Sequence, residues 1–213
     1  MSECAMILAA GRGERLRPHT DSCPKPLLEV NARPLIFYHL ESLALAGVSK
    51  VVVNLSWLGE QIEAAVGDGR QFGLRVIYSC EPEPLDAAGG IVQALDLLDD
   101  RFVVVNADIY TNYRFENLTS IDSKAHLVLV NNPDHNLQGD FALNHGRLSN
   151  AFSPRLTFSG IAIYQKCFFE DCTPGKRALA PLLRAAADEG IVSGEIFEGN
   201  WVDVGTVERW QSI

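Results

Sequence analysis

The stretch LAAGRGERLRP at residues 8–18, followed by PKP at residues 24–26, decides how the rest of the chain is interpreted. An apolar run at residues 5–9 leads into it, which predicts a buried strand that ends in a glycine-rich loop. Glycines let backbone N–H groups approach a phosphate, and cations neutralise its charge. The loop carries arginines, and Lys25 follows ten residues after Arg15. The pattern therefore predicts a nucleoside triphosphate site.

The spacing excludes two other phosphate-binding loops. A Walker loop requires Gly-Lys-Ser/Thr after four spacer residues, and this sequence has none. The dinucleotide fingerprint requires a third glycine at position 16, where Leu16 stands. A dinucleotide-dependent oxidoreductase is therefore disfavoured, and a solvated basic loop remains the simplest alternative.

Composition narrows the class of protein. The chain has 213 residues, 47% of them apolar, which predicts one domain over residues 1–213. The net charge of −9 disfavours nucleic-acid binding and suggests that a divalent cation helps to hold a polyanion. No apolar run is long enough to cross a bilayer, no secretory signal is evident, and the five cysteines form no C-x-x-C pair. We expect a cytoplasmic protein with reduced thiols, no membrane contact and no disulfide framework.

Apolar strands alternate with helical segments in the first half. Strands are expected at residues 51–54, 76–78, 102–106 and 127–130, and helices at residues 35–45, 62–66 and 87–98. This alternation predicts an α/β fold with a mixed, mostly parallel sheet covered on both faces. Ligands bind beyond the carboxyl ends of such strands, so the strands that end at residues 9 and 106 are expected to be neighbours across one crevice.

The second half is less regular. Asn144-His145-Gly146 predicts the turn of a hairpin, and a strand at residues 158–164 and a helix at residues 178–187 follow it. The sheet is expected to continue into this half, which supplies a lid over the crevice.

Two aspartates occupy similar sequence contexts. Asp108 follows the strand at residues 102–106, and Asp203 follows the short apolar segment that begins at Trp201. Mg²⁺ prefers a few carboxylates together with phosphate oxygens and water, so the two predict a shared magnesium site. The alternative is that each aspartate caps the element after it.

These motifs resemble the sugar-1-phosphate nucleotidyltransferases, whose pattern is Leu-Ala-Ala-Gly-x-Gly-x-Arg-Leu-x-Pro followed by Pro-Lys-Pro. Both aspartate motifs match that family as well. The resemblance implies a Rossmann-like three-layer sandwich of the nucleotide-diphospho-sugar transferase type. It also implies a nucleotide-binding half over residues 1–110 and a sugar-binding and lid half over residues 111–213.

The resemblance also implies roles for individual residues. Arg15 and Lys25 are the expected catalytic cations, Arg15 on the pyrophosphate and Lys25 between the α-phosphate and the incoming phosphate. Asp108 and Asp203 are the expected metal ligands. The implied nucleotide-binding residues are Leu8, Ala10, Gly11, Arg12, Gly13, Lys25, Glu81, Pro84, Ala88 and Gly89.

The segment at residues 81–90 corresponds to the part of the family that frames the nucleobase. Asp86 and Ala87 stand where many members have Gly and Thr. The Glu81 carboxylate can accept a hydrogen bond from uracil N3–H, but guanine offers it more donors. Chemistry alone therefore does not decide which nucleobase is bound. Candidate sugar ligands, each equally able to act as a solvated or capping residue, are Asn106, Gly139, Asp140, Ser159 and Glu195.

Within the family, the chain resembles the short bacterial N-acetylmuramate α-1-phosphate uridylyltransferases. That resemblance implies UTP and N-acetylmuramate 1-phosphate as substrates, Mg²⁺ as cofactor, a part in peptidoglycan recycling, and a monomer or weak homodimer. The alternatives are a mannose- or glucose-1-phosphate nucleotidyltransferase that uses GTP or dTTP, and a non-catalytic subunit that senses nucleotide sugars.

Overall fold

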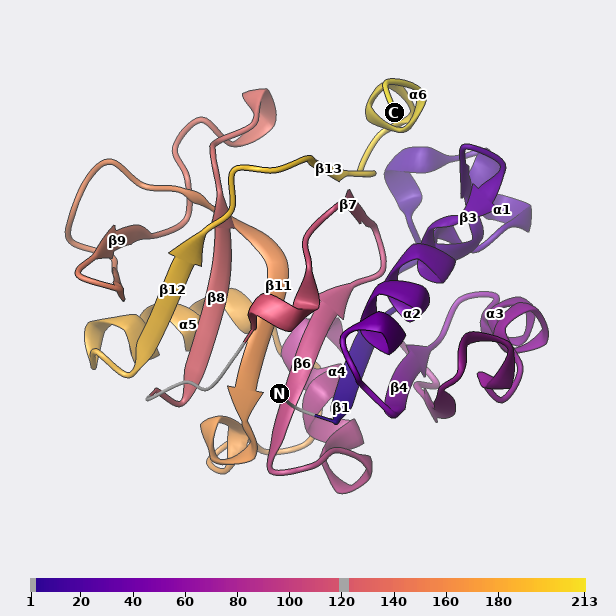
Figure 1. Cartoon of the computed structure of the whole chain (residues 1–213), viewed down its shortest axis with the longest axis horizontal. Helices are drawn as coiled ribbons and strands as arrows, with labels where there is room; N and C mark the ends of the chain where they lie inside the picture. The colour runs from indigo at the N-terminus through magenta and orange to yellow at the C-terminus, as the bar shows by residue number, and fades with distance from the viewer. Residues whose placement is uncertain (1–2, 119–122) are drawn as a thin grey trace.

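A nine-stranded sheet runs through the computed structural model, which describes residues 3–118 and 123–213 (Figure 1). Among the described strands, β11 and β10 run opposite to the other seven, so the sheet is mixed and mostly parallel, as the alternation predicts. In sheet order the strands are β5 (Arg75–Cys80), β4 (Lys50–Leu55), β1 (Cys4–Leu8), β6 (Arg101–Asn106), β11 (Thr157–Gln165), β8 (Ala125–Val130), β12 (Val192–Ile196), β10 (Arg147–Ser149) and β9 (Ala142–Asn144).

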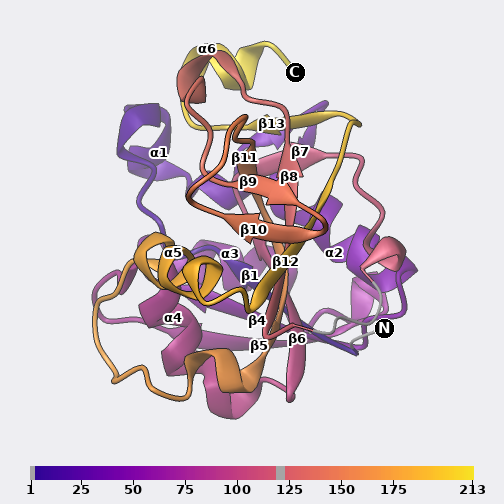
Figure 2. The ribbon, with the colours of Figure 1, turned by 90° about the vertical axis from the view of Figure 1, so that its left-hand side faces the viewer.

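Helices cover both faces of this sheet, which confirms the three-layer arrangement (Figure 2). Successive side chains of β1 point to opposite faces. Ala5 and Ile7 pack on the side of α2 (Leu35–Leu45) and α3 (Gly59–Val66). Cys4 and Met6 pack on the side of α4 (Asp86–Ala94) and α5 (Leu179–Asp188). The central strands are apolar throughout because both of their faces are buried.

The expected strands and helices are all present, but some bounds differ and several strands, among them β12 of the main sheet, were not expected. The helix expected at residues 87–98 ends at Ala94 and continues as a 3₁₀ turn. The third helix begins at Gly59, because Leu58 has a left-handed backbone with φ of 51°. The strand β7 (Ile109–Thr111), which follows Asp108 directly, is not anticipated in the sequence.

The hairpin forms as predicted. Strands β9 and β10 pair antiparallel, and His145 and Gly146 both have positive φ, of 47° and 75°. That is the geometry of a two-residue turn whose twist matches the flanking strands.

Two small ribbons and two short helices lie at the end of the sheet where the site forms. Strand β7 pairs with β13 (Trp201–Asp203), and β2 (Glu29–Val30) pairs with β3 (Arg33–Pro34). Helix α1 (His19–Ser22) follows the glycine-rich loop, and α6 (Val207–Gln211) follows β13. Within residues 3–118 and 123–213, no helix has the length and apolar character that a membrane span needs, and no disulfide joins any of the five cysteines.

We expect Leu40→Ala to lower the free energy of unfolding by about 2–5 kcal/mol, because Leu40 is fully buried between α2 and the sheet. Leu45→Ala in the same helix is the matched control, since Leu45 is 81% exposed. Urea unfolding of both variants measures the difference. Equal losses would contradict the packing described.

Candidate active site

The site lies where β1 and β6 end side by side. Leu8 pairs with Asn106, and the Ala107 N–H donates to the Leu8 carbonyl at 3.0 Å. The loops that follow these two strands therefore leave the sheet at the same edge, as their sequence predicts.

A cavity of about 230 Å³ opens at this edge. It brings together nine of the predicted site residues: Leu8, Ala10, Gly11, Gly13, Lys25, Glu81, Pro84, Asn106 and Asp108. The other residues that line it, for which no binding role was predicted, are Ala9, Pro26, Asn54, Asp86, Ala87 and Ala107.

The glycine-rich loop is shaped around Lys25. Gly13 has φ of 69°, and a Cβ there would lie 3.0 Å from Thr20 Cγ2 and 3.3 Å from Lys25 Cβ. The Thr20 hydroxyl donates to the Gly13 carbonyl at 2.8 Å, which fixes the turn. A Cβ on Gly11 would contact no described atom within 4 Å, so that part of the loop leaves room for a ligand.

The three arginines of the loop have different surroundings. Arg15 lines a hollow of about 390 Å³ together with Lys25 and Gly205. The Arg12 guanidinium lies 4.3 Å from the ring centre of Trp57, and Arg17 pairs with Asp21 at 2.7 Å. Arg15 is therefore the arginine placed beside Lys25, whereas Arg12 is outside the cavity lining.

Lys25 forms an ion pair with Asp108. Its Nζ lies 2.5 Å from Asp108 Oδ2, and only 9% of the Lys25 residue is exposed. A short 3₁₀ turn at Lys25–Leu27 holds the lysine under the loop. The pair joins the glycine-rich loop to the end of β6.

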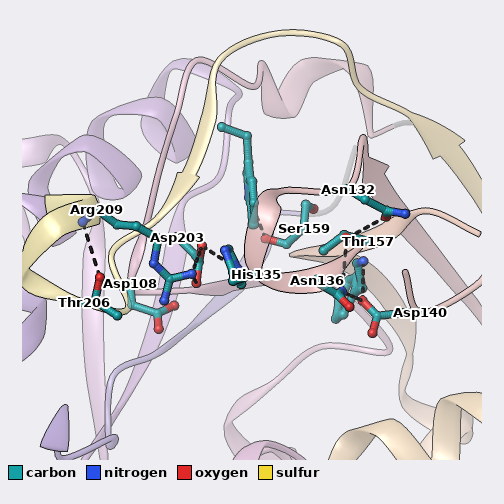
Figure 3. A network of polar contacts seen from close by, with 12 residues as sticks. Asp108, Asn132, His135, Asn136, Asp140, Thr157, Ser159, Asp203, Thr206 and Arg209 are labelled. Carbon is teal, nitrogen blue, oxygen red and sulfur yellow. Dashed lines mark hydrogen bonds and ion pairs between the residues drawn. The ribbon is translucent and has the colours of Figure 1, made fainter. Parts of the chain in front are cut away.

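Asp203 is brought next to Asp108 by strand pairing. In the β7–β13 ribbon Asp203 pairs with Ile109, and the Val204 N–H donates to the Asp108 carbonyl at 2.7 Å. Figure 3 shows the two carboxylates in the same region of the site. The predicted convergence of these aspartates is thus present in the structure.

Two further residues balance the charge of Asp203. Arg209 of α6 lies 2.8 Å from its carboxylate, and His135 Nε2 lies 3.1 Å away (Figure 3). Burial raises the pKa of Asp203 and the Asp108 charge raises it further, whereas Arg209 and His135 oppose that shift. Neither Arg209 nor His135 was identified from the sequence, because nothing in their spacing links them to Asp203.

The donor set fits a cation of the Mg²⁺ type. Asp108 and Asp203 supply carboxylate oxygens from opposite halves of the chain. In the part of the chain that the structure describes, no group of three or more His, Cys, Asp or Glu side chains forms a closed metal site. Mg²⁺ binds through one or two carboxylates and completes its shell with phosphate oxygens and water, so two aspartates suffice.

Asn54 holds the opposite wall of the cavity together. Its Oδ1 accepts from the Ala9 N–H at 2.7 Å, and its Nδ2 donates to Glu81 Oε1 at 2.6 Å. Glu81 Oε2 accepts from the Leu85 N–H at 2.8 Å. Glu81 is only 4% exposed, so its carboxylate orients the loop at residues 82–85 as well as lining the cavity.

Ala88 and Gly89 do not line the cavity. Their N–H groups both donate to the Arg177 carbonyl at 3.1 Å, and a Cβ on Gly89 would lie 2.4 Å from the Gly175 carbonyl oxygen. The segment at residues 175–177 thus covers the start of α4, and Asp86 and Ala87 face the cavity instead.

The predicted sugar ligands separate into two groups. Asn106 and Asp140 line a second cavity, of about 460 Å³, next to the first. Gly139 and Ser159 support it from outside the lining: Gly139 has φ of 63° against the Arg155 backbone, and the Ser159 hydroxyl accepts from the Ile161 N–H at 3.1 Å.

Glu195 lines neither the first nor the second cavity. It pairs with Val128, whose side chain belongs to the core on the α2 face, whereas the second cavity lies on the α5 face. Its carboxylate accepts from Tyr113 Oη at 2.5 Å. Burial acts to raise its pKa, but the hydrogen bonds from His126 and Tyr113 outweigh burial and lower it. Side chains alternate between the two faces of a strand, and this alternation directs Glu195 to the α2 face of the sheet, away from the second cavity.

Comparison with known proteins confirms the family that the motifs indicate. A family model described as nucleotidyl transferase matches residues 4–137. The N-acetylmuramate alpha-1-phosphate uridylyltransferase of Neisseria meningitidis serogroup B is 48% identical over 217 residues, which cover 96% of this chain and 94% of that protein. The mannose-1-phosphate guanyltransferase of Aspergillus fumigatus is 40% identical over 124 residues, which cover 56% of this chain and 34% of that protein.

A solved structure confirms the fold. HddC from Yersinia pseudotuberculosis, complexed with GMP-PN, superposes with a TM-score of 0.82, covering 100% of this chain and 97% of that one at 23% identity.

His39 beneath the site makes stability depend on pH. Burial lowers its pKa from 6.5 to about 4, and its Nε2 has no hydrogen-bond partner among the described residues. Since the unfolded chain binds a proton below pH 6.5 and the folded chain does not, stability falls as the pH drops from about 6.5 to about 4. The loss approaches about 3 kcal/mol, at about 1.4 kcal/mol for each pKa unit.

Urea unfolding of the wild type and of His39→Phe between pH 4 and pH 7.5 measures this effect. We expect the difference in unfolding free energy between the two proteins to change with pH in that window. A constant difference would contradict a neutral buried histidine.

Proposed function

We propose a function for this chain on the premise that it belongs to the nucleotidyl transferase family. The chain transfers UMP from UTP to N-acetylmuramate α-1-phosphate and releases pyrophosphate. The observation that carries this proposal is the likeness to the Neisseria uridylyltransferase over almost the full length of both chains. The cavity and its charged residues supply what the reaction needs.

The substrates define the task of the protein. A phosphate oxygen of the sugar phosphate attacks the α-phosphorus of UTP in line, and pyrophosphate leaves. Because the reactants are both anions, positioning and charge neutralisation provide most of the catalysis. Lys25 lies under the loop, where its ammonium can bridge the α-phosphate and the incoming phosphate. Arg15, in the adjoining hollow, is placed to hold the pyrophosphate.

Asp108 and Asp203 are the residues that hold Mg²⁺ in this proposal. When bound, the ion acts as a Lewis acid on phosphate oxygens and orients them. In the structure, Lys25 pairs with Asp108, and Arg209 and His135 both contact the carboxylate of Asp203. These contacts hold the two carboxylates in neighbouring positions, which supports a shared role in binding the metal.

Glu81 and Asn54 position the base in this proposal. Each Glu81 oxygen accepts one hydrogen bond in the structure, a carboxylate oxygen can accept a second, and Glu81 lines the cavity. An N–H of the base can therefore be received without breaking the contacts that hold the loop. The product in this proposal is a nucleotide sugar of the cell wall, so the role that we propose is in peptidoglycan recycling in the cytoplasm. The proposed active form is a monomer or a weak homodimer.

A mannose- or glucose-1-phosphate nucleotidyltransferase that uses GTP or dTTP is the second candidate, favoured by the partial match to the Aspergillus guanyltransferase. Pyrophosphate release from each common triphosphate, with a panel of sugar 1-phosphates and Mg²⁺, decides between them. Highest kcat/KM with UTP and N-acetylmuramate 1-phosphate is the expected result. A faster reaction with another sugar would overturn the substrate assignment, and no pyrophosphate with any pair would favour a sensing subunit.

Lys25→Ala is expected to lower kcat by about 10²–10³-fold, because it removes the charge that stabilises the reacting phosphate. Lys50→Ala, which breaks a surface pair with Asp99, is the matched control and should retain activity. Circular dichroism and thermal unfolding check that both variants are folded. Near-normal turnover by folded Lys25→Ala would rule out the role given to this lysine.

Asp203→Asn and Asp108→Asn are each expected to raise the Mg²⁺ concentration for half-maximal activity by about tenfold or more, since each removes a charged ligand. Asp21→Asn is the control, because Asp21 pairs with Arg17 at the surface. Titration of activity with Mg²⁺ measures the shift. Unchanged magnesium curves in both site variants would exclude a shared site.

A further inference from the structure

A second cavity, of about 460 Å³, adjoins the nucleotide cavity and shares Asp86, Ala87 and Asn106 with it. Its walls come from α5, from the segment that enters the hairpin and from the start of β11, which lie together in Figure 2. Much of the wall is apolar: Phe141, Phe158, Leu179 and Leu183. A group attached to the phosphate site through Asn106 can therefore extend into an apolar chamber.

One cation lines this chamber. Leu179 and Leu183 of α5 pack into the core, and the residues that follow each of them, Ala180 and Arg184, border the cavity. Ala180 and Arg184 are four residues apart, so they lie one turn apart on the same face of the helix. Both residues are exposed and the Ala180 side chain is short, so Arg184 is accessible at the border of the chamber. Within residues 3–118 and 123–213, no carboxylate lies within 4 Å of the Arg184 side-chain nitrogens.

Two carboxylates line this chamber, Asp86 and Asp140, and that of Asp140 is already engaged. Asp140 Oδ2 accepts from the Phe158 N–H at 2.8 Å and from Asn136 Nδ2 at 3.4 Å, as Figure 3 shows for the surrounding network. These bonds tie Asp140 to β11 and to the segment at residues 132–136. Neither Asp86 nor Asp140 forms an ion pair with Arg184 in the described part of the chain, so its guanidinium is left to pair with a charge that a ligand brings.

We propose that Arg184 is a specificity-determining residue that binds a carboxylate on the sugar of the sugar-phosphate substrate. This inference rests on the proposed function and adds the recognition element for the acidic sugar. N-acetylmuramate differs from N-acetylglucosamine by a lactyl ether, which carries one methyl group and one carboxylate. The apolar wall suits the methyl groups, and a guanidinium binds a carboxylate through two parallel hydrogen bonds.

A plain hexose phosphate in the same chamber offers no carboxylate to Arg184. A hydroxyl in place of the lactyl group leaves the guanidinium without an anion and leaves the apolar wall facing a void. Discrimination between acidic and neutral sugars therefore comes from one charged contact together with the shape of the wall.

The test compares Arg184→Gln, Arg184→Lys and wild type with N-acetylmuramate 1-phosphate and N-acetylglucosamine 1-phosphate, at saturating UTP. Arg184→Gln is expected to lower kcat/KM for the muramyl substrate by tenfold or more, through KM, and to leave the value for the neutral sugar unchanged. Arg184→Lys should give an intermediate value, because it keeps the charge and loses the two-pronged geometry. Arg70→Gln, at an exposed arginine far from both cavities, is the control and should keep the wild-type ratio.

The outcomes separate this inference from the proposed function. If wild type prefers the muramyl substrate and Arg184→Gln keeps that preference, the role of Arg184 is wrong and the function stands. If wild type prefers another sugar phosphate, both are wrong. Calorimetric titration of UDP-N-acetylmuramate and UDP-N-acetylglucosamine into each folded variant provides a second measurement. A loss of affinity confined to the acidic product supports the proposal, and equal losses for both products contradict it.

Discussion

Repulsion between two carboxylates held side by side is the constraint on which the site depends. The pairing of β7 with β13 places Asp203 next to Ile109, and hence next to Asp108. Half-buried like charges are costly unless cations accompany them. Lys25, Arg209 and His135 meet that requirement from three separate parts of the chain. Contacts with these two carboxylates therefore bring three segments together: the loop after β1, the segment before β9 and helix α6.

The sheet determines what surrounds this charged centre. Asn106, at the end of β6, borders both cavities, and it fits there because Gly160 of β11 has φ of 83° and no side chain. A Cβ on Gly160 would lie 2.6 Å from Asn106 Nδ2. A single amide at the edge of the central strands thus lies between the two cavities. Asp108 lines the first of them.

Features that depend on one short segment could be predicted from the sequence, whereas contacts between distant segments could not. Strand β6 was predictable because it is apolar throughout, and Asp108 was predictable because it follows that strand. The sequence pattern of a strand separates its two faces but does not show which face borders a cavity. For this reason the sequence did not show that Glu195 lies outside both cavities. Asn54 and Arg184 were not identified, because their surroundings are created by loops and helices distant in the sequence.

The order of translation has a consequence for when this site can exist. Lys25 and Asp108 emerge from the ribosome well before Asp203 and Arg209. Strands β5, β4, β1 and β6 pair with one another, and only β11, the other neighbour of β6, is synthesised later. The second acid arrives only with β13, so a polypeptide stalled before that point lacks both Asp203 and the Arg209 that pairs with it.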